Sequence, residues 1–152
     1  MLETILKKTP FLLQRRQIQP RNEKDIRSVM HDYLGAFFTE YKNHVTIPGV
    51  IRDFKPDGGV RNLKAAIEFK FAGTHAEVRQ AMAGVFEDIS GYAGSLDWIH
   101  FYSVIYQTSA FESEDRVKSE LSRSGNVTWK ALLVTGKGAR VQNRKGRPSK
   151  RG

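Results

Sequence analysis

Three residues in the middle of the chain have the types and spacing of a hydrolytic metal site. Asp57 follows a proline, and ten residues separate it from the run Glu68-Phe69-Lys70. Glu68 and Lys70 are two positions apart, so on a β-strand both side chains leave the face opposite Phe69. Two converging carboxylates repel each other, which favours a hard cation such as Mg²⁺ between them. A neighbouring lysine can stabilise charge on a phosphate or help to lower the pKa of an attacking water.

At these residues the chain resembles the PD-(D/E)XK nuclease superfamily, in which Pro-Asp, a short spacer and Glu-x-Lys form the metal and catalytic centre. The resemblance implies a restriction-endonuclease-like fold that cuts phosphodiester bonds of nucleic acid with Mg²⁺, for which Mn²⁺ can substitute. It also implies that Asp57 and Glu68 bind metal, that the carbonyl of Phe69 is a further ligand, and that Lys70 orients or activates the water. The core of that family is a helix, a three-stranded meander, a second helix and a strand, which is similar to the order expected over residues 22–108.

Two further carboxylates are candidate metal ligands. Fourteen residues separate Asp53 from Glu68, and Asp53 could approach Glu68 as Asp57 does. The proline that precedes Asp57 favours Asp57. Several members of the superfamily add an acid from the first helix. At about 100° per residue, Glu23 falls near the centre of the apolar stripe of that helix. A first-turn glutamate is equally typical of the favourable interaction with the helix dipole.

Each part of the motif also occurs in ordinary structure. The charges of Glu68 and Lys70 are typical of a solvent-facing strand, and Pro-Asp-Gly-Gly from Pro56 is typical of a turn. Their order, with a bend before the strand and a helix after it, favours the catalytic interpretation. On that following helix, Arg79 and Gln80 lie off the apolar face, where they either contact a phosphate backbone or are simply solvated.

The pattern of apolar residues predicts the elements that position these groups. A helix of about five turns begins at the N-cap Asn22 and continues to Tyr41. Residues 45–51 read as a strand, residues 53–59 as a bend and residues 64–71 as a half-buried strand. Helix, strand, helix and strand follow at residues 75–90, 98–108, about 112–123 and 127–135. We expect an α/β fold with a mixed β-sheet flanked by helices, in the order αβββαβ followed by αβ.

The 152 residues, 39% of them hydrophobic, suit one compact domain. We expect an irregular arm or short helix over residues 1–21, the nuclease-like domain over residues 22–135 and a flexible basic tail over residues 136–152. Residues 123–152 hold nine Lys or Arg and no Asp or Glu, which equals the net charge of +9. The preceding region is therefore neutral in sum, and a polyanion would be attracted mainly by this end of the chain.

The tail contains a run that resembles the core of an AT-hook, a short extended element that lies in narrow A·T minor grooves. The run is Lys145-Gly146-Arg147-Pro148, with Lys145 where that family has Arg. Narrow grooves attract basic side chains through their enhanced negative potential. Arg144, Lys145 and Arg147 are therefore candidate nucleic-acid contacts, and a solubilising end is the equally weighted alternative.

Composition excludes several other classes of site. With no cysteine, the chain has no disulfide, thiol nucleophile or Cys-ligated zinc. The lack of a long apolar segment or secretory signal predicts a cytoplasmic protein that does not bind membrane. The sequence thus predicts a Mg²⁺-dependent nuclease, most simply a DNA endonuclease, as a homodimer or as a subunit of a larger complex. The alternative is a non-catalytic DNA-binding or partner-binding protein on a nuclease-like fold, with the tail giving affinity.

Overall fold

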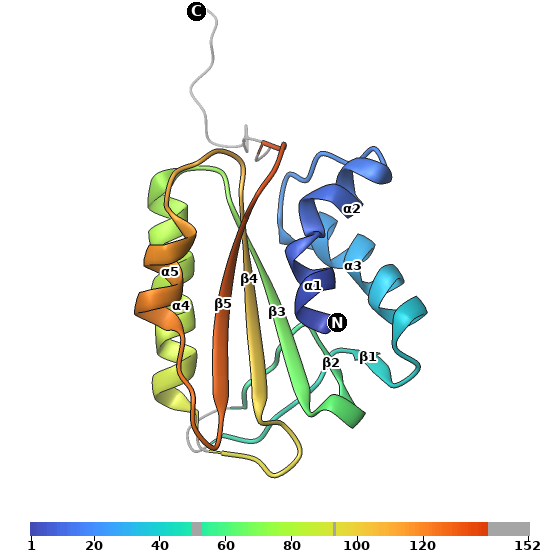
Figure 1. Cartoon of the computed structure of the whole chain (residues 1–152), viewed down its shortest axis with the longest axis vertical. Helices are drawn as coiled ribbons and strands as arrows, with labels where there is room; N and C mark the ends of the chain where they lie inside the picture. Colours follow the sequence, from blue (N-terminus) through green and yellow to red (C-terminus); the bar gives the residue numbers. More distant parts are fainter. Residues whose placement is uncertain (50–52, 93, 140–152) are drawn as a thin grey trace, which may run out of the picture.

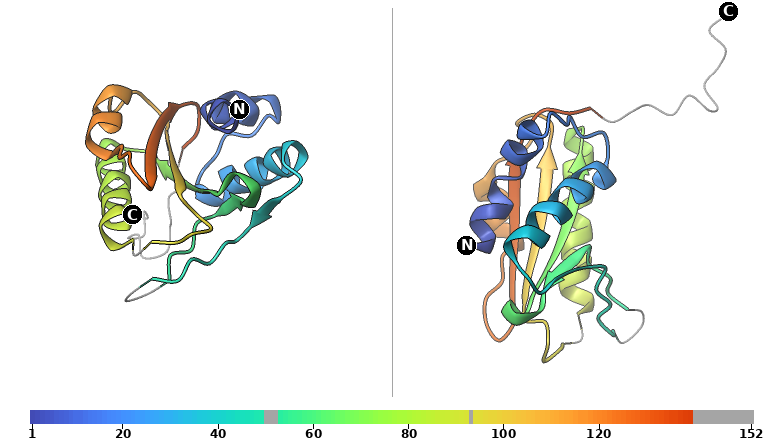
Figure 2. Two further views of the ribbon diagram at one scale, coloured as in Figure 1. Left: turned by 60° about the horizontal axis from the view of Figure 1, so that its bottom comes forward. Right: turned by 90° about the vertical axis from the view of Figure 1, so that its right-hand side faces the viewer.

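The computed structural model describes residues 1–49, 53–92 and 94–139, which form a five-stranded β-sheet with helices on both faces (Figure 1). The elements are α1 (Leu2–Lys7), α2 (Thr9–Arg15), α3 (Glu23–Phe37), β1 (Tyr41–Asn43), β2 (Gly58–Val60), a 3₁₀ turn η1 (Arg61–Leu63), β3 (Ala65–Ala72), α4 (His75–Gly91), β4 (His100–Gln107), α5 (Glu114–Leu121) and β5 (Thr128–Thr135). Helices α4 and α5 cover one face of the sheet, whereas α1, α2 and α3 lie against the other (Figure 2). The expected α/β architecture is confirmed. None of the helices in these ranges has the length and apolar character needed to cross a bilayer.

The order of strands in the sheet is the same as their order in the chain. Strands β1, β2 and β3 form an antiparallel meander, whereas β3, β4 and β5 are parallel and are connected through α4 and α5. Strand β2 is short, and Gly58 opposite Ile67 is its last pair with β3. Residues 68–72 of β3 therefore extend beyond β2, and this extension carries the Glu-x-Lys motif.

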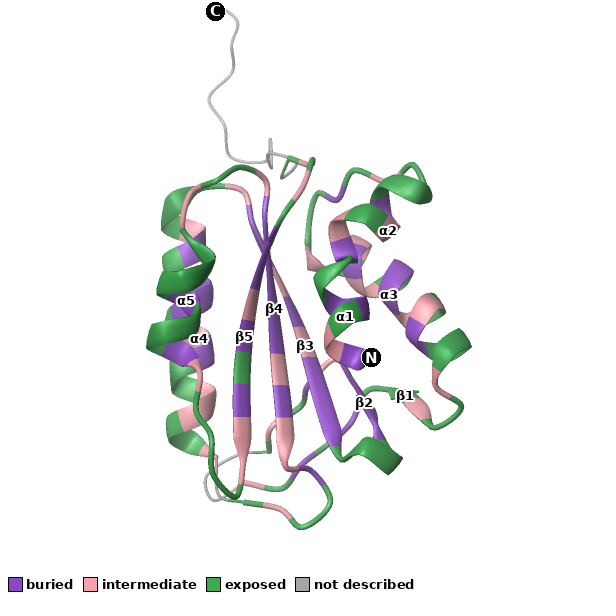
Figure 3. Cartoon of the chain, in the orientation of Figure 1, coloured by how far each residue is buried: buried purple, intermediate pink, exposed green. Residues whose placement is uncertain are grey.

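Strand β3 is mostly buried (Figure 3), and alternation divides its side chains between the two faces of the sheet. Ile67, Phe69 and Phe71 pack with the apolar residues of α1, α2 and α3. Ala72, on the opposite face, packs with α4 and α5. Because side chains alternate along a strand, Glu68 and Lys70 share the face of Ala72 and lie under α4.

The first helices belong to the domain core. Leu2, Leu6 and Leu13, from α1 and α2, are buried in the same cluster as Phe69. The segment expected to be an irregular arm or short helix is thus mainly helical, because its apolar residues are spaced to cover the sheet. After β5 the chain stays attached, since the N–H of Ala139 donates to the carbonyl of Pro20. The remainder of the predicted tail, residues 140–152, lies outside the described residues.

The helix predicted from Asn22 to Tyr41 is shorter than expected. Asn22 does cap it, since its side chain accepts a hydrogen bond from the N–H of Asp25, but α3 ends at Phe37. The apolar spacing continues past this end because Phe38 and Tyr41 pack against the same core cluster from extended backbone. A periodic pattern of burial was therefore produced by two kinds of backbone.

The meander also differs from its prediction. The strand predicted over 45–51 is wrong for the described residues 45–49, where a single bridge joins Ile47 to Phe54, and β1 lies earlier. The residues predicted to form a bend instead provide the middle strand, β2, for which the sequence offered no range. Gly58 and Gly59 serve close packing here, because a Cβ on Gly59 would lie 2.6 Å from the ring of Trp98. Tertiary contacts thus decide the conformation of two residues that are common in turns.

Candidate active site

The part of β3 beyond β2 is bordered by carboxylates from two other elements. Asp57, one residue before β2, accepts a hydrogen bond of 2.7 Å from the N–H of Phe69. Glu23, in the first turn of α3, accepts one of 3.3 Å from the N–H of Phe71. Alternate N–H and C=O groups of a strand face the same edge, so both carboxylates line the edge that β2 leaves. The structure therefore brings Asp57 and Glu23 together beside the Glu-x-Lys strand.

Glu68 and Lys70 occupy the adjacent face of β3, under α4. Nζ of Lys70 lies 3.7 Å from Oε2 of Glu68, and their side chains are only 19% and 21% exposed, respectively. Gly84 of α4 leaves the space for this lysine, because a Cβ there would lie 3.2 Å from Nζ. The ion pair is thus enclosed between the strand and the helix rather than exposed on a solvated face.

The environment of Glu68 favours its protonated form. Burial raises the pKa of this carboxyl to about 8, the charge of Lys70 opposes the rise, and the charge and hydrogen bond of Asp88 on α4 add to it. The same cause, burial, raises the pKa of Asp57, while the N–H of Phe69 and the charge of Arg27 lower it. The charge of Glu23 acts in the raising direction on Asp57. The charge of one carboxylate therefore affects the pKa of another, as expected of groups that share one site.

The oxygen atoms are of the type that binds a hard divalent cation. Oε2 of Glu68 is buried and accepts no hydrogen bond within the described part of the chain, although Nζ of Lys70 lies 3.7 Å from it. Carboxylate oxygens are the ligands that Mg²⁺ prefers. Within residues 1–49, 53–92 and 94–139, however, no three His, Asp or Glu side chains are gathered closely enough to hold a metal ion. Glu23 and Asp57 instead hold backbone N–H groups of β3.

Two charged residues of this region were missed by the sequence analysis. Arg27 on α3 places Nη1 3.6 Å from Oδ1 of Asp57, and Asp88 on α4 acts on Glu68. The signal for Arg27 was its position one helical turn after Glu23, and the signal for Asp88 was its position one turn after Gly84. Neither spacing is informative until it is known which helical faces meet at the edge of β3.

The other predicted site residues lie farther out. Asp53 is exposed beside the Ile47–Phe54 bridge, so the structure brings Asp57 rather than Asp53 to the strand. Arg79 and Gln80 are exposed on α4. Gln80 lies one turn before Gly84, on the flank nearest Lys70, whereas Arg79 lines a cavity of about 490 Å³ between α4 and α5. Arg144, Lys145 and Arg147 lie outside the described residues.

In comparisons with known proteins, no protein-family model, curated protein or solved structure matches the chain. The fold and the contacts at the edge of β3 are therefore the features that bear on the function.

Proposed function

We propose that the protein is a metal-dependent nuclease of the PD-(D/E)XK type, with its active site at the edge of β3. The observation that carries the proposal is the meeting of Asp57, Glu23 and the Glu68–Lys70 pair around one short stretch of strand. These groups come from three separate parts of the chain. Their arrangement gives the motif a common location, which sequence order alone does not provide.

The topology supports the proposal. Helix α3, the meander β1–β2–β3, the crossover helix α4 and the parallel strand β4 follow the order that the resemblance implies for the nuclease core. The resemblance implies that the meander carries the motif, and here the aspartate lies directly before β2 and Glu-x-Lys lies on β3. We therefore extend the α/β assignment to a restriction-endonuclease-like fold as part of the proposal.

Each residue has a distinct task in this mechanism. Oxygen atoms of Asp57, Glu68 and Glu23 would hold Mg²⁺, and the ion would supply Lewis-acid stabilisation of the phosphate and a lowered pKa of a water. Glu68 must release its proton for this task, because only the carboxylate binds a cation. Nζ of Lys70 orients the water and stabilises the charge that develops on the phosphate oxygens. The oxygen of water forms a bond to phosphorus as one P–O ester bond breaks, and the proton that the water loses is balanced by the proton that the leaving alkoxide takes up.

The proposal is tested by cleavage of plasmid DNA, single-stranded DNA and RNA with Mg²⁺ or Mn²⁺, against EDTA. The parent should cut at least one substrate only when metal is present, with DNA as the expected substrate. Asp57→Asn and Glu68→Gln should both abolish cutting, because each removes an anionic ligand while preserving the shape of the side chain. Thermal unfolding of each variant verifies that the fold is intact.

Asp53→Asn is the matched control, since it removes the same charge from an exposed residue close in sequence to Asp57. We expect it to cut like the parent. If instead Asp53→Asn is inactive and Asp57→Asn is active, the assignment of the metal aspartate is wrong. If the folded parent cuts none of the three substrates, catalysis is wrong and the protein is better described as a binding module on this fold.

A further inference from the structure

Next to Asp57 lies a group of basic and imidazole side chains that the proposed metal site does not use. Arg27 and His31 project from α3 one helical turn apart, in line with Glu23. Arg27 reaches Asp57, so this group begins where the carboxylates end. His44, from the segment after β1, completes it with its ring centroid 6.3 Å from that of His31.

Contacts from two strands hold this group in place. Nδ1 of His31 lies 2.5 Å from the hydroxyl of Tyr41, which packs where a Cβ on Gly58 would collide with it. The N–H of His44 donates to the carbonyl of Asp57 over 3.0 Å. The φ angle of His44 is 61°, in the left-handed region that side chains other than glycine rarely adopt. The backbone conformation of His44 is therefore tied to Asp57.

The group combines one permanent cation, Arg27, with two imidazole rings. Burial lowers the pKa of His31, and the charges of His44 and Arg27 lower it further, so its ring is neutral at neutral pH. Burial and the charge of Asp57 raise the pKa of Tyr41, so this hydroxyl keeps its proton, and it shares a hydrogen bond with Nδ1 of His31. The hydrogen bond through Nδ1 leaves Nε2 of His31 beside the exposed His44 and the partly exposed Arg27.

We propose that Arg27, His31 and His44 bind the phosphate next to the scissile phosphate in a nucleic-acid strand. The inference rests on the proposed nuclease function, because it takes the scissile phosphate to lie at the carboxylates. About 6 Å along the helix axis separates Glu23 from Arg27, and again Arg27 from His31. A backbone that follows α3 thus meets the carboxylates first and the donors next. The substrate is then a chain with adjacent phosphates rather than a phosphomonoester.

The first test measures binding without cleavage. The full chain in EDTA is titrated with a short single-stranded DNA while the side-chain ¹⁵N signals of its histidines are followed by NMR. His31 and His44 should shift as the strand binds. His75 and His100, from α4 and β4, are the internal references and should shift less. Equal shifts at all four histidines, or none at His31 and His44, would overturn the proposal.

The second test uses substitutions in the same metal-free buffer. Arg27→Gln should weaken strand binding about tenfold, because it removes a charge-assisted hydrogen bond to phosphate. It should also flatten the dependence of log affinity on log salt by about 0.7, the value for one phosphate contact on a single strand. His44→Asn keeps a residue that tolerates the left-handed backbone and should weaken binding less.

Lys118→Gln is the matched control, since Lys118 is an exposed cation on α5, which covers the opposite face of the sheet. If Arg27→Gln and Lys118→Gln weaken binding equally, net charge explains the effect and the phosphate subsite is wrong. A parent that cuts DNA while His31 and His44 do not respond would retain the nuclease and remove this subsite. A parent that never cuts, but whose His31 and His44 respond, would retain the phosphate site and remove the nuclease.

Discussion

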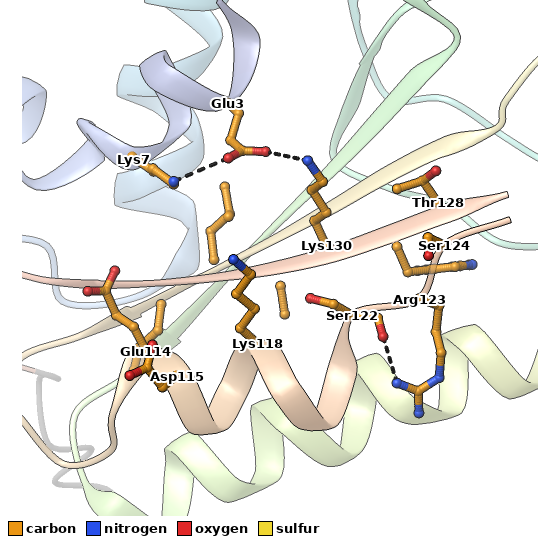
Figure 4. A pocket seen from close by; sticks show the side chains of 14 residues that line it. Glu3, Lys7, Glu114, Asp115, Lys118, Ser122, Arg123, Ser124, Thr128 and Lys130 are labelled. Carbon is orange, nitrogen blue, oxygen red and sulfur yellow. Dashed lines mark hydrogen bonds and ion pairs between the residues drawn. The ribbon is translucent and has the colours of Figure 1, made fainter.

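The outer edge of β5 and the extension of β3 beyond β2 are both lined by lysine and glutamate, but their charges are arranged in opposite ways. At β5, Glu3 of α1 lies 2.9 Å from Nζ of Lys130 and 3.2 Å from Nζ of Lys7 (Figure 4). The hydrogen bond with Lys130 lowers the pKa of Glu3, and that with Glu3 raises the pKa of Lys130. Each partner therefore stabilises the charged form of the other. At β3, burial raises the pKa of both Glu68 and Asp57 against the effect of nearby cations.

This difference separates charges that stabilise one another from the charges of the proposed active site. The β5 edge has a cavity of about 350 Å³ and mixed charges, yet its carboxylate Glu3 is already paired with the ammonium groups of Lys7 and Lys130. The β3 edge holds carboxylates whose charge the fold disfavours. Perturbed groups of this kind gather at functional sites because a ligand can supply the missing interaction. A cation at the acids and an anion at Arg27 would do so here.

The largest expected effect is on catalysis, and it contrasts the lysines of the two edges. Lys70→Met should slow DNA cleavage by about 10²–10⁴-fold, the range for a group that assists proton transfer or charge development. Lys130→Met removes the same charge from β5 and should leave the rate within about twofold, because its partner is the structural Glu3. Initial rates at saturating Mn²⁺ measure both variants. Equal losses would mean that the two edges do not differ in function.

A second contrast concerns stability and pH. The pKa of Glu68 in the folded state is raised to about 8. The contribution of its protonated form to the free energy of unfolding is therefore complete at acid pH and is lost as pH rises through about 8. Glu68→Gln should therefore unfold like the parent near pH 5 and be more stable near pH 9 in EDTA, by on the order of a few kcal/mol. Chemical denaturation at the two pH values measures this. No gain at pH 9 would contradict the burial of an unfavourable charge.

Glu3→Gln should show the reverse dependence. Lys130 and Lys7 lower the pKa of Glu3. The contribution of its ionised form to the free energy of unfolding is therefore present at neutral pH and is lost as pH falls through the lowered pKa. The variant should be less stable than the parent at pH 7 by under about 1 kcal/mol, as for other surface ion pairs. At strongly acid pH the difference should vanish. A larger loss for Glu3→Gln than gain for Glu68→Gln would invert the comparison of the two edges.

Metal binding should depend on the proton of Glu68. Below about pH 8 the cation must displace that proton, so apparent affinity for Mn²⁺ should rise with pH, by up to about tenfold per unit, and level off above pH 8. Calorimetry at several pH values measures the affinity, and buffers of different ionisation enthalpy reveal the released proton. Glu68→Gln should bind weakly at every pH. Affinity that is independent of pH between 6 and 8 would contradict a role for Glu68 as ligand.

The sequence predicted those features of the site that depend on the local pattern of residues. Alternation placed Glu68 and Lys70 on one face of a strand, and helical spacing selected Glu23. The strand Gly58–Val60 was not predicted, because its glycines are required by contacts with Tyr41 and Trp98, which are both distant in sequence. The roles of Arg27 and Asp88 were not predicted, because their contacts depend on how α3 and α4 cross the sheet. Composition reported the excess of charge correctly but could not tell which charges satisfy one another.

The smallest expected effect tests how closely the fold fits Lys70. Gly84→Ala should stabilise α4 by about 0.5–1 kcal/mol, because glycine is unfavourable within a helix. The new Cβ would lie 3.2 Å from Nζ, so the end of Lys70 must shift by a few tenths of an ångström. Catalytic groups depend strongly on position, and we expect cleavage to fall several-fold. Gly35→Ala is the control, since no atom lies within 4 Å of a Cβ built there on α3, and it should gain similar stability without losing activity. If both variants cut equally well, Gly84 serves only to make room, and the position of Lys70 is less critical than the enclosed ion pair indicates.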